Sequence, residues 1–277
     1  GLSAGDFLKE TGLIVHGTTV ATNAVLTGNG AKAGLITTQG FRDILQMRRG
    51  WREEFFNNKR PLPAPLIRRA LRRTVAGRLD ETGAELEPLD EAGVREEALR
   101  LKAEGVESVV LCFIHAWANS DHERRAAEIV HEVFPEAFLT VSSELLPQIR
   151  LYERVSTCAF NAYVGPIIQK YLEKLDTSLR EAGFAGALLI MGSHGGVMTA
   201  PVAARRAASS LLSGPAAAPV AGVDLLVDEG EEGLRRSRGR ASGEALVPAL
   251  SGQGARRVQH LDEGFGGLGV ARHQVLD

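Results

Sequence analysis

Apolar and polar positions along the chain follow two different periods, which predict short strands that alternate with helices. Continuous runs of β-branched and other apolar residues, as expected of buried strands, lie at residues 13–15, 33–37, 106–114, 138–141 and 187–191. Segments with helical spacing lie between them, at residues 18–26, 41–47, 91–103, 123–133 and 152–179. Pro166 is expected to break or kink the last of these helices. This alternation predicts an α/β fold with a mainly parallel sheet.

One polar segment, residues 48–89, interrupts the alternation. It is punctuated by prolines but still contains Trp51, Phe55 and Phe56, which predicts a loop or a small β insertion rather than a linker. Within it, residues 78–83 are typical of a hairpin turn between two short strands. Asp90 is placed to cap the helix that follows.

Residues 223–277 differ in composition from the rest of the chain. They contain no Ile, Lys, Thr, Asn, Tyr, Trp, Met or Cys, and such a composition builds a core poorly. Two explanations remain open, a disordered tail or the translation of GC-rich DNA in the wrong frame. The chain also begins with Gly1 rather than Met, which indicates that its true start lies upstream.

The overall composition argues against some classes of function. Lys+Arg 32 against Asp+Glu 34 gives a net charge of −2, which argues against binding nucleic acid or an anionic membrane through bulk charge. No apolar run approaches the roughly 20 residues that span a bilayer. Two cysteines, Cys112 and Cys158, make no disulfide framework, so a reduced, cytoplasmic protein is the simplest interpretation.

The first stretch with candidate chemistry is HGTTVATN, residues 16–23, between a predicted strand and the next helix. Gly17 permits a tight turn, and Thr18 and Thr19 can cap the helix and present hydroxyl groups. The helix N-terminus offers unpaired N–H groups that suit a phosphate, and His16 can contact an anion or transfer a proton. A plain strand–turn–helix junction capped by threonine accounts for the same residues.

Two further stretches place small residues next to predicted elements. In MGSHGGV, residues 191–197, Ser193 and His194 can line a pocket at the carboxyl end of the sheet, although a flexible turn explains them equally. In SGPAAA, residues 213–218, Ser213 can cap a helix of small residues with Pro215 in its first turn. That capped helix is also the simplest explanation of the stretch.

The remaining polar groups point less clearly to chemistry. MRRGWREE, residues 47–54, places arginines beside acids and a tryptophan, which can clamp a carboxylate or phosphate or form a solvated surface. Cys112, His115 and His122 do not match a zinc spacing, and Cys112 is expected to be a core thiol. Residues 121–123 are expected to begin a helix rather than to act in catalysis.

Several of these stretches, taken in order, resemble one family. The runs HGTTVATNAVL, AKAGLITTQGFRDILQMRRG, YERVST at residues 152–157, NAYV at residues 161–164 and LSGPAA are similar to the hydantoinase/oxoprolinase family. The chain most resembles the A-type subunit of ATP-dependent hydantoinases and the related subunits of acetone and acetophenone carboxylases. The resemblance covers residues 1–222.

The resemblance implies an actin-like ATPase (ribonuclease-H-like) fold, here partial and with a small inserted α+β region. It implies ATP and Mg2+ as cofactors, without indicating the metal ligands. It assigns catalytic roles to His16, Thr18 and Thr19. It places the following residues at the cofactor: Gly17, Thr22, Asn23, Ser193, Gly195, Gly196, Ser213 and Gly214. The family usually has Asn where this chain has His194.

The resemblance also implies an organisation. Residues 1–145 would form the N-terminal region without its first phosphate loop, residues 146–222 the start of the hydantoinase A domain, and residues 223–277 a low-complexity or frame-shifted tail. Two acidic, glycine-rich phosphate motifs of the family are absent, so we expect an internal fragment, whose sheet would lack its leading strands.

Three functions remain open at this stage. The first is a subunit that hydrolyses a cyclic amide after phosphoryl activation. The second is a subunit of an ATP-dependent acetone- or acetophenone-type carboxylase. The third is a catalytically inactive remnant or a subunit-interaction module. A B-type subunit and a small-molecule substrate are the partners that the resemblance implies.

Overall fold

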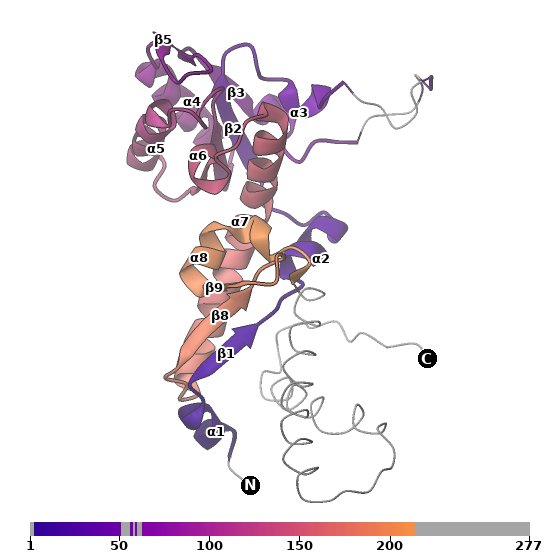
Figure 1. The fold of residues 1–277 in the computed structure, drawn as a ribbon, viewed down its shortest axis with the longest axis vertical. Coiled ribbons are helices and arrows are strands. Elements are labelled where there is room, and N and C mark those ends of the chain that lie inside the picture. The colour runs from indigo at the N-terminus through magenta and orange to yellow at the C-terminus, as the bar shows by residue number, and fades with distance from the viewer. Residues whose placement is uncertain (1–2, 51–55, 58, 60–62, 214–277) are drawn as a thin grey trace, which may run out of the picture. The chain divides into compact units, whose positions relative to one another are not determined.

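The computed structural model describes residues 3–50, 56–57, 59 and 63–213. The chain divides into two units, Gly1–Val223 and Asp224–Asp277, and every described residue belongs to the first. The tail predicted at residues 223–277 and the helix predicted around Pro215 lie outside the described residues. The first unit is a mixed α/β structure built on two sheets and a two-stranded ribbon (Figure 1).

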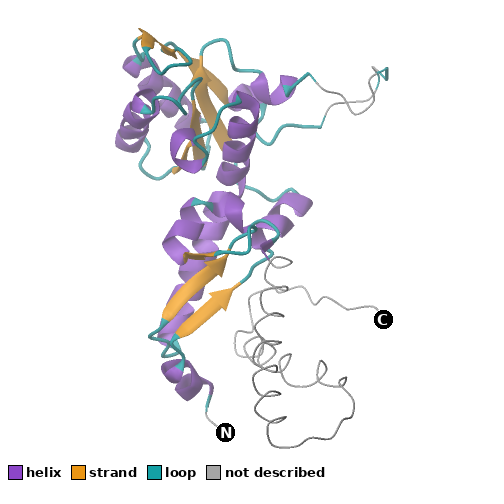
Figure 2. Ribbon diagram, in the orientation of Figure 1, coloured by secondary structure: helices purple, strands orange, loops and turns teal. Residues whose placement is uncertain are grey.

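The first sheet has the strand order β1-β8-β9. β1 (Leu13–His16) runs parallel to β8 (Ala187–Met191), with Leu13 opposite Ala187 and His16 opposite Ile190. β9 (Val197–Thr199), which the sequence pattern did not predict, pairs antiparallel with β8. The helices α2 (Val20–Thr27) and α8 (Ala200–Arg205) and the 3-10 helix η2 (Ala207–Ser210) follow these strands. Figure 2 shows the strands of the two sheets as separate groups.

The second sheet holds most of the hydrophobic core. Its strands are all parallel, in the order β3 (Arg72–Val75), β2 (Ala33–Thr38), β6 (Ser108–Cys112) and β7 (Phe138–Val141). β2 and β6 are buried at every position, as expected of central strands covered by helices on both faces. α4 (Glu91–Ala103) and α5 (Asp121–Val133) cover one face, and α7 (Leu151–Glu181) covers the other (Figure 1).

The segment predicted as an insertion is only partly one. β4 (Arg78–Leu79) and β5 (Glu85–Glu87) form the predicted hairpin, and the Asp80 carboxylate accepts the backbone N–H of Thr82 at 2.8 Å in its turn. However, β3 joins the main sheet as an edge strand, which corrects the prediction for residues 48–89. The two consecutive arginines that open β3 hid it, because the search was for continuous apolar runs. α3 (Ile44–Met47) and the 3-10 helix η1 (Arg69–Leu71) lie nearby in the chain.

α7 is the element that both sheets share. It contacts β6 and β7 of the second sheet, and also α2, α8 and η2 beside the first. The predicted break at Pro166 is absent, and the helix is assigned without interruption over 31 residues. Pro166 has no N–H for the carbonyl of Ala162, and the Ser108 hydroxyl donates to that carbonyl at 2.7 Å instead. A neighbouring strand thus supplies the hydrogen bond that the proline cannot make.

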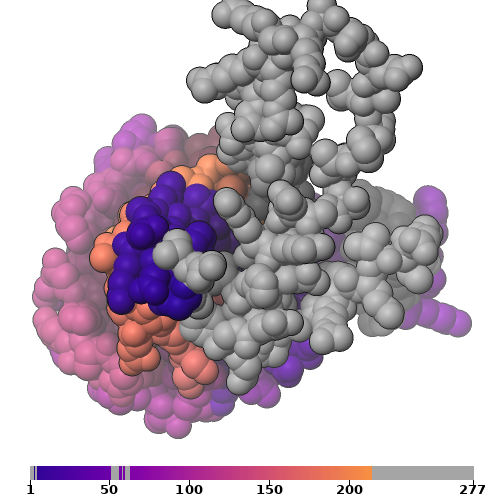
Figure 3. All heavy atoms as spheres, turned by 90° about the horizontal axis from the view of Figure 1, so that it is seen from below, coloured from indigo at the N-terminus to yellow at the C-terminus, as the bar shows by residue number. Residues whose placement is uncertain are grey.

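Two short features complete the first unit. α1 (Ala4–Glu10) begins at Ser3, whose hydroxyl accepts the N–H of Asp6, and α6 (Ser142–Leu145) precedes α7. In Figure 3 the N-terminal residues (indigo) lie beside residues of the later chain (orange), consistent with Leu8 being buried. β1 is less buried than predicted, because Leu13 is 53% and Val15 47% exposed on this edge strand. None of the described helices is long and apolar enough to cross a membrane.

Candidate functional site

The candidate site lies where two neighbouring parallel strands of the first sheet end. β1 ends at His16, and β8 ends at Met191 in the adjacent position of the sheet. The two loops that follow, residues 17–19 and 192–196, therefore start from the same edge. Open α/β sheets bind ligands at the carboxyl ends of their strands. The topology thus brings the first two candidate stretches to one place.

Ser213 connects the stretch SGPAAA, residues 213–218, to the stretch HGTTVATN, residues 16–23. Its hydroxyl donates to the carbonyl of Thr18 at 3.0 Å and accepts the N–H of Thr18 at 3.2 Å. Both residues are buried. One side chain therefore satisfies both backbone groups of Thr18 and holds the residue that precedes α2 in a single conformation.

The segment that presents Ser213 is itself constrained. Leu212 has a left-handed φ of 57°, which is unusual for a leucine, and its N–H donates to the Thr22 hydroxyl at 3.4 Å. A non-glycine residue in this region persists only where the surrounding contacts hold it. The contacts of Thr18 and Thr22 with residues 212–213 give α2 two attachments to this segment.

The N-terminus of α2 lies beside the segment of residues 212–213. Thr19 is the N-cap residue and is exposed, but its side chain makes no capping hydrogen bond; the Thr18 hydroxyl instead accepts the N–H of Val20 at 3.2 Å. The Asn23 side chain donates to the Thr19 hydroxyl at 3.4 Å. The first-turn amides of a helix lack intrahelical acceptors. The first-turn amides after Val20 and the exposed Thr19 hydroxyl are hydrogen-bond donors suited to an oxyanion.

His16 is part of the site but carries no charge near neutral pH. Its Nε2 lies 2.8 Å from the Tyr171 hydroxyl of α7, and the two rings lie 5.9 Å apart between centroids. Burial lowers the pKa of His16 below its usual value. A neutral imidazole can accept or donate a hydrogen bond, but it brings no positive charge to an anion. Tyr171 was not singled out from the sequence, because nothing local distinguishes it from other helical residues.

The loop after β8 is a tight turn organised by its own backbone and by His194. The N–H of Gly192 donates to the carbonyl of Gly196 at 2.7 Å, and Gly195 has a left-handed φ of 80°. The His194 Nδ1 accepts the N–H of Gly196 at 3.0 Å, so this histidine closes the turn. The N–H of Ser193 donates to the carbonyl of Ser209 at 2.7 Å, while its side chain is exposed.

The stretch MRRGWREE, residues 47–54, is described only in part. Arg49 forms an ion pair with Glu153 near the start of α7. Trp51 and the acids beside it lie outside the described residues, as does Gly214 of the stretch SGPAAA.

A buried carboxylate in α5 was not expected from the sequence. Glu123 is fully buried and accepts hydrogen bonds from the N–H of Phe113 at 2.8 Å, the Ser142 hydroxyl at 2.6 Å and the N–H of Ser143 at 2.7 Å. Burial raises its pKa. Its donors directly follow β6 and β7 in the chain, so Glu123 ties α5 to the ends of these strands. A glutamate in an amphipathic helix gives no sequence signal of such burial.

The side chains of the described residues limit the chemistry that this part of the chain can supply. Burial raises the pKa of Cys112 to about 11, so this thiol is not a nucleophile near neutral pH. No group of three or more His, Cys, Asp or Glu side chains in the described ranges is placed to hold a metal ion. The strand-end site offers amides, hydroxyls and a neutral imidazole. That set suits the binding of a phosphate-like oxyanion.

Comparisons with known proteins match most of the chain. The family described as hydantoinase/oxoprolinase N-terminal region matches residues 4–134, and the hydantoinase/oxoprolinase family matches residues 154–233. The second match extends past Gly222, where the sequence resemblance was expected to end.

Individual relatives are much longer than this chain. Caprolactamase subunit alpha of Pseudomonas jessenii is 35% identical over 80% of this chain and 32% of its own length. Acetophenone carboxylase gamma subunit of Aromatoleum aromaticum is 32% identical over 71% of this chain and 29% of its own. The crystal structure of ATP-dependent caprolactamase from Pseudomonas jessenii aligns with a TM-score of 0.75 and 34% identity, covering 83% of this chain and 33% of that one. The chain thus spans about a third of the length of these relatives.

Proposed function

The chain belongs to the hydantoinase/oxoprolinase family, and from this we propose that it binds the phosphate groups of ATP at the carboxyl ends of β1 and β8. It would do so as part of a subunit that opens a cyclic amide by phosphoryl activation. The proposal assigns the phosphates to the loop after β1, the first turn of α2 and the loop after β8. A relative supports this proposal, because a caprolactamase described as ATP-dependent has the same fold over this region.

The observation that carries the proposal is the hydroxyl bridge between Ser213 and Thr18. Two stretches far apart in the sequence meet there in one buried contact. The bridge fixes the turn before α2, so the first-turn amides are oriented before any ligand arrives. Preorganised donors stabilise a phosphate better than donors that must first be ordered.

In this proposal each residue has a limited task. ATP, when bound, supplies the phosphoryl group that makes an amide carbonyl reactive toward water. The Thr19 hydroxyl, the α2 amides and the exposed Ser193 hydroxyl hold its phosphates, while Gly195 and Gly196 shape the turn that presents Ser193. His16, neutral and hydrogen-bonded to Tyr171, holds or accepts a proton at the edge of this site.

Magnesium fits this site only through the nucleotide. No acidic side chain lies among the residues assigned to it, so the described part of the chain offers no carboxylate ligand there. Mg2+ bound to ATP usually keeps several waters and phosphate oxygens as ligands. We therefore assign no step and no residue to the metal.

The proposal extends to assembly and location. Two relatives are named as subunits, which supports a partner subunit, and the B-type subunit is our proposal for it. We also propose residues 1–145 and 146–222 as the two family regions within this chain. Cys112 and Cys158 are both free and buried, which supports a reducing compartment such as the cytoplasm.

Calorimetric titration of the 277-residue chain with ATP and Mg2+ tests the nucleotide site. We expect saturable binding, weakened about tenfold by Thr19→Val, which removes an exposed hydroxyl at the N-terminus of α2. Thr27→Val removes a hydroxyl at the other end of the same helix and should leave binding unchanged. A folded chain that binds no ATP, or equal losses in the two variants, would contradict the proposal. The absence of binding would favour the inactive remnant or subunit-interaction module instead.

One alternative keeps the nucleotide site but changes the reaction. The similarity to an acetophenone carboxylase subunit supports an ATP-dependent carboxylation of a ketone. Phosphate release from ATP, measured in the complete complex, separates the two reactions. Release that depends on a cyclic amide such as a hydantoin, 5-oxoproline or a lactam supports the hydrolase. Release that depends on a ketone together with bicarbonate supports the carboxylase.

A further inference from the structure

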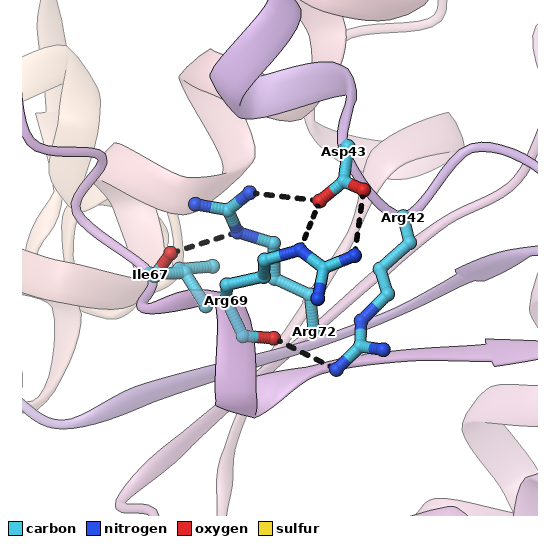
Figure 4. A network of polar contacts seen from close by, with 5 residues as sticks. All are labelled: Arg42, Asp43, Ile67, Arg69 and Arg72. Carbon is cyan, nitrogen blue, oxygen red and sulfur yellow. Dashed lines mark hydrogen bonds and ion pairs between the residues drawn. The ribbon is translucent and has the colours of Figure 1, made fainter. Parts of the chain in front are cut away.

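A cluster of three arginines around one aspartate lies at the β3 edge of the second sheet, away from the residues assigned to the nucleotide. Arg42 and Asp43 precede α3, Arg69 opens η1, and Arg72 opens β3. Figure 4 shows their side chains grouped together, with the carbonyl of Ile67 beside Arg72. None of these residues belongs to the strand-end site. The cluster was not singled out from the sequence, because its members are separated along the chain.

The one carboxylate of the cluster is already engaged by a single arginine. Asp43 accepts two hydrogen bonds from Arg69, from Nε at 2.8 Å and from Nη2 at 2.9 Å (Figure 4). These bonds lower the pKa of Asp43, so it is ionised near neutral pH. A bidentate pair of this kind occupies both oxygens of the carboxylate and balances its charge with one guanidinium group. Three guanidinium groups therefore share one negative charge.

Arg72 is the least satisfied member of the cluster. It is 1% exposed, and its Nε donates to the carbonyl of Ile67 at 2.9 Å. Its Nη1 lies 3.8 Å from Asp43 Oδ1, beyond hydrogen-bond distance, and has no hydrogen-bond partner among the described residues. A buried guanidinium without full hydrogen bonding is rare, because the loss of hydration is not offset.

Arg42 shows the same deficit. Its Nη2 donates to the carbonyl of Arg69 at 3.2 Å, but its Nε is buried and lacks a hydrogen-bond partner in the part of the chain that the structure describes. Two buried N–H donors from two arginines are thus left over in one cluster. A water molecule could accept from such donors, but it would not neutralise their charge.

The balance of charge favours an anion over water. Burial lowers the pKa of Arg72, Asp43 raises it, and the positive charges of Arg69 and Arg42 lower it further. The repulsion among the guanidinium groups is therefore only partly compensated. An oxyanion would accept the leftover hydrogen bonds and neutralise the excess positive charge at the same time.

We propose that Arg42, Arg69 and Arg72 form a binding site for a small oxyanion, a phosphate or carboxylate group of a ligand distinct from the proposed nucleotide. Asp43 acts as the positioning residue that fixes the Arg69 guanidinium beside the other two. Guanidinium groups are the preferred partners of both phosphate and carboxylate because their N–H donors match two oxygens at once.

Calorimetric titration of the full chain with inorganic phosphate, in a Tris chloride buffer of low ionic strength, tests the site. Arg42→Gln and Arg72→Met each remove one guanidinium with an unpaired donor. Arg68→Gln makes the same change of charge at an exposed neighbouring arginine and serves as the control. We expect saturable binding that is at least about tenfold weaker in the first two variants and within about twofold in the control. Circular dichroism verifies folding, and if Arg72→Met does not fold, Arg42→Gln decides.

The other outcomes overturn the proposal. No saturable binding to the wild-type chain would exclude the site. An equal loss in Arg68→Gln would show an effect of bulk charge, and unchanged binding in Arg42→Gln and Arg72→Met would place the phosphate elsewhere. A parallel titration with malonate identifies the source of the oxyanion. The same variant pattern with either anion supports the site, and the tighter of the two shows whether the ligand carries phosphate or carboxylate.

Discussion

The Ser213 side chain shows how much one hydroxyl can decide in this chain. It is buried and exchanges two hydrogen bonds with the backbone of Thr18. The sequence suggested Ser213 as a helix cap, and the family resemblance suggested it as a cofactor residue. Its contact with Thr18 depends on two segments that are distant in sequence, so no local pattern could predict it.

At the residue scale we predict that Ser213→Ala lowers the free energy of unfolding by about 1–3 kcal/mol. The substitution leaves a buried N–H and a buried carbonyl of Thr18 without a partner, and such groups are costly. Urea denaturation followed by circular dichroism measures the change. Ser193→Ala is the control, because that side chain is exposed and only its backbone N–H is engaged. Similar losses in the two variants would refute a special role for the bridge.

His16 illustrates the opposite relation between residue type and environment. As a histidine after a strand, it could have been either a cation or a proton carrier. Its burial, with the Tyr171 hydroxyl at 2.8 Å, lowers its pKa and removes the first role near neutral pH. A histidine can act as a cation or as a proton carrier, and burial beside Tyr171 of α7 favours the second role.

At the scale of elements, α7 shows why a proline need not end a helix. The N–H that Pro166 lacks would have bonded to the carbonyl of Ala162, and the Ser108 hydroxyl of β6 takes its place at 2.7 Å. Close packing supports this arrangement. A Cβ at Gly165 would lie 2.2 Å from the ring of Phe138, so a larger residue there would force this ring to move.

We predict that Ser108→Ala destabilises the protein by about 1–3 kcal/mol, because Ala162 is left with a buried, unsatisfied carbonyl. In a Pro166→Ala background the same substitution should cost less, since the new N–H at position 166 can bond to that carbonyl. A double-mutant cycle by chemical denaturation measures the coupling between the two positions. Additive effects would argue against the compensation.

At the scale of the described unit, Asn161 connects the elements of both sheets. Its Nδ2 donates to the Thr140 hydroxyl of β7 and to the carbonyl of Arg205 at the end of α8, both at 3.0 Å. Its Oδ1 accepts the N–H of Ala208 in η2 at 3.0 Å. One buried amide therefore holds α7 to the second sheet and to the helices beside the first.

We predict that Asn161→Ala lowers the free energy of unfolding by roughly 2–4 kcal/mol, because three polar partners lose their hydrogen bonds in a buried place. Gln169→Ala removes an exposed amide from the same helix and should change stability by less than about 0.5 kcal/mol. Urea denaturation measures the change in the free energy of unfolding for both variants. A loss in Asn161→Ala no larger than in Gln169→Ala would contradict this role.

Local sequence patterns were enough to predict the central strands of the core and the family. The strands at residues 33–38 and 108–112 and the helix capped by Asp90 follow from apolar runs and a local hydrogen bond to Gly93, which depend on neighbours in the chain. The family resemblance rested on ordered motifs, and the matches to residues 4–134 and 154–233 confirm it. Such features are local or inherited, so the sequence carries them directly.

The positions and contacts of these elements, in contrast, became known only from the fold. In the fold, β3 is an edge strand of the main sheet rather than part of an insertion. Leu13 and Val15 are exposed on an edge strand, and α7 continues without interruption past Pro166. The fold also brings Ser213 to Thr18 and gathers the three arginines around Asp43. Burial, edge position and hydrogen bonds between distant segments depend on which surfaces meet. That information is absent from any one stretch of the chain and arises only when the sheets and α7 pack together.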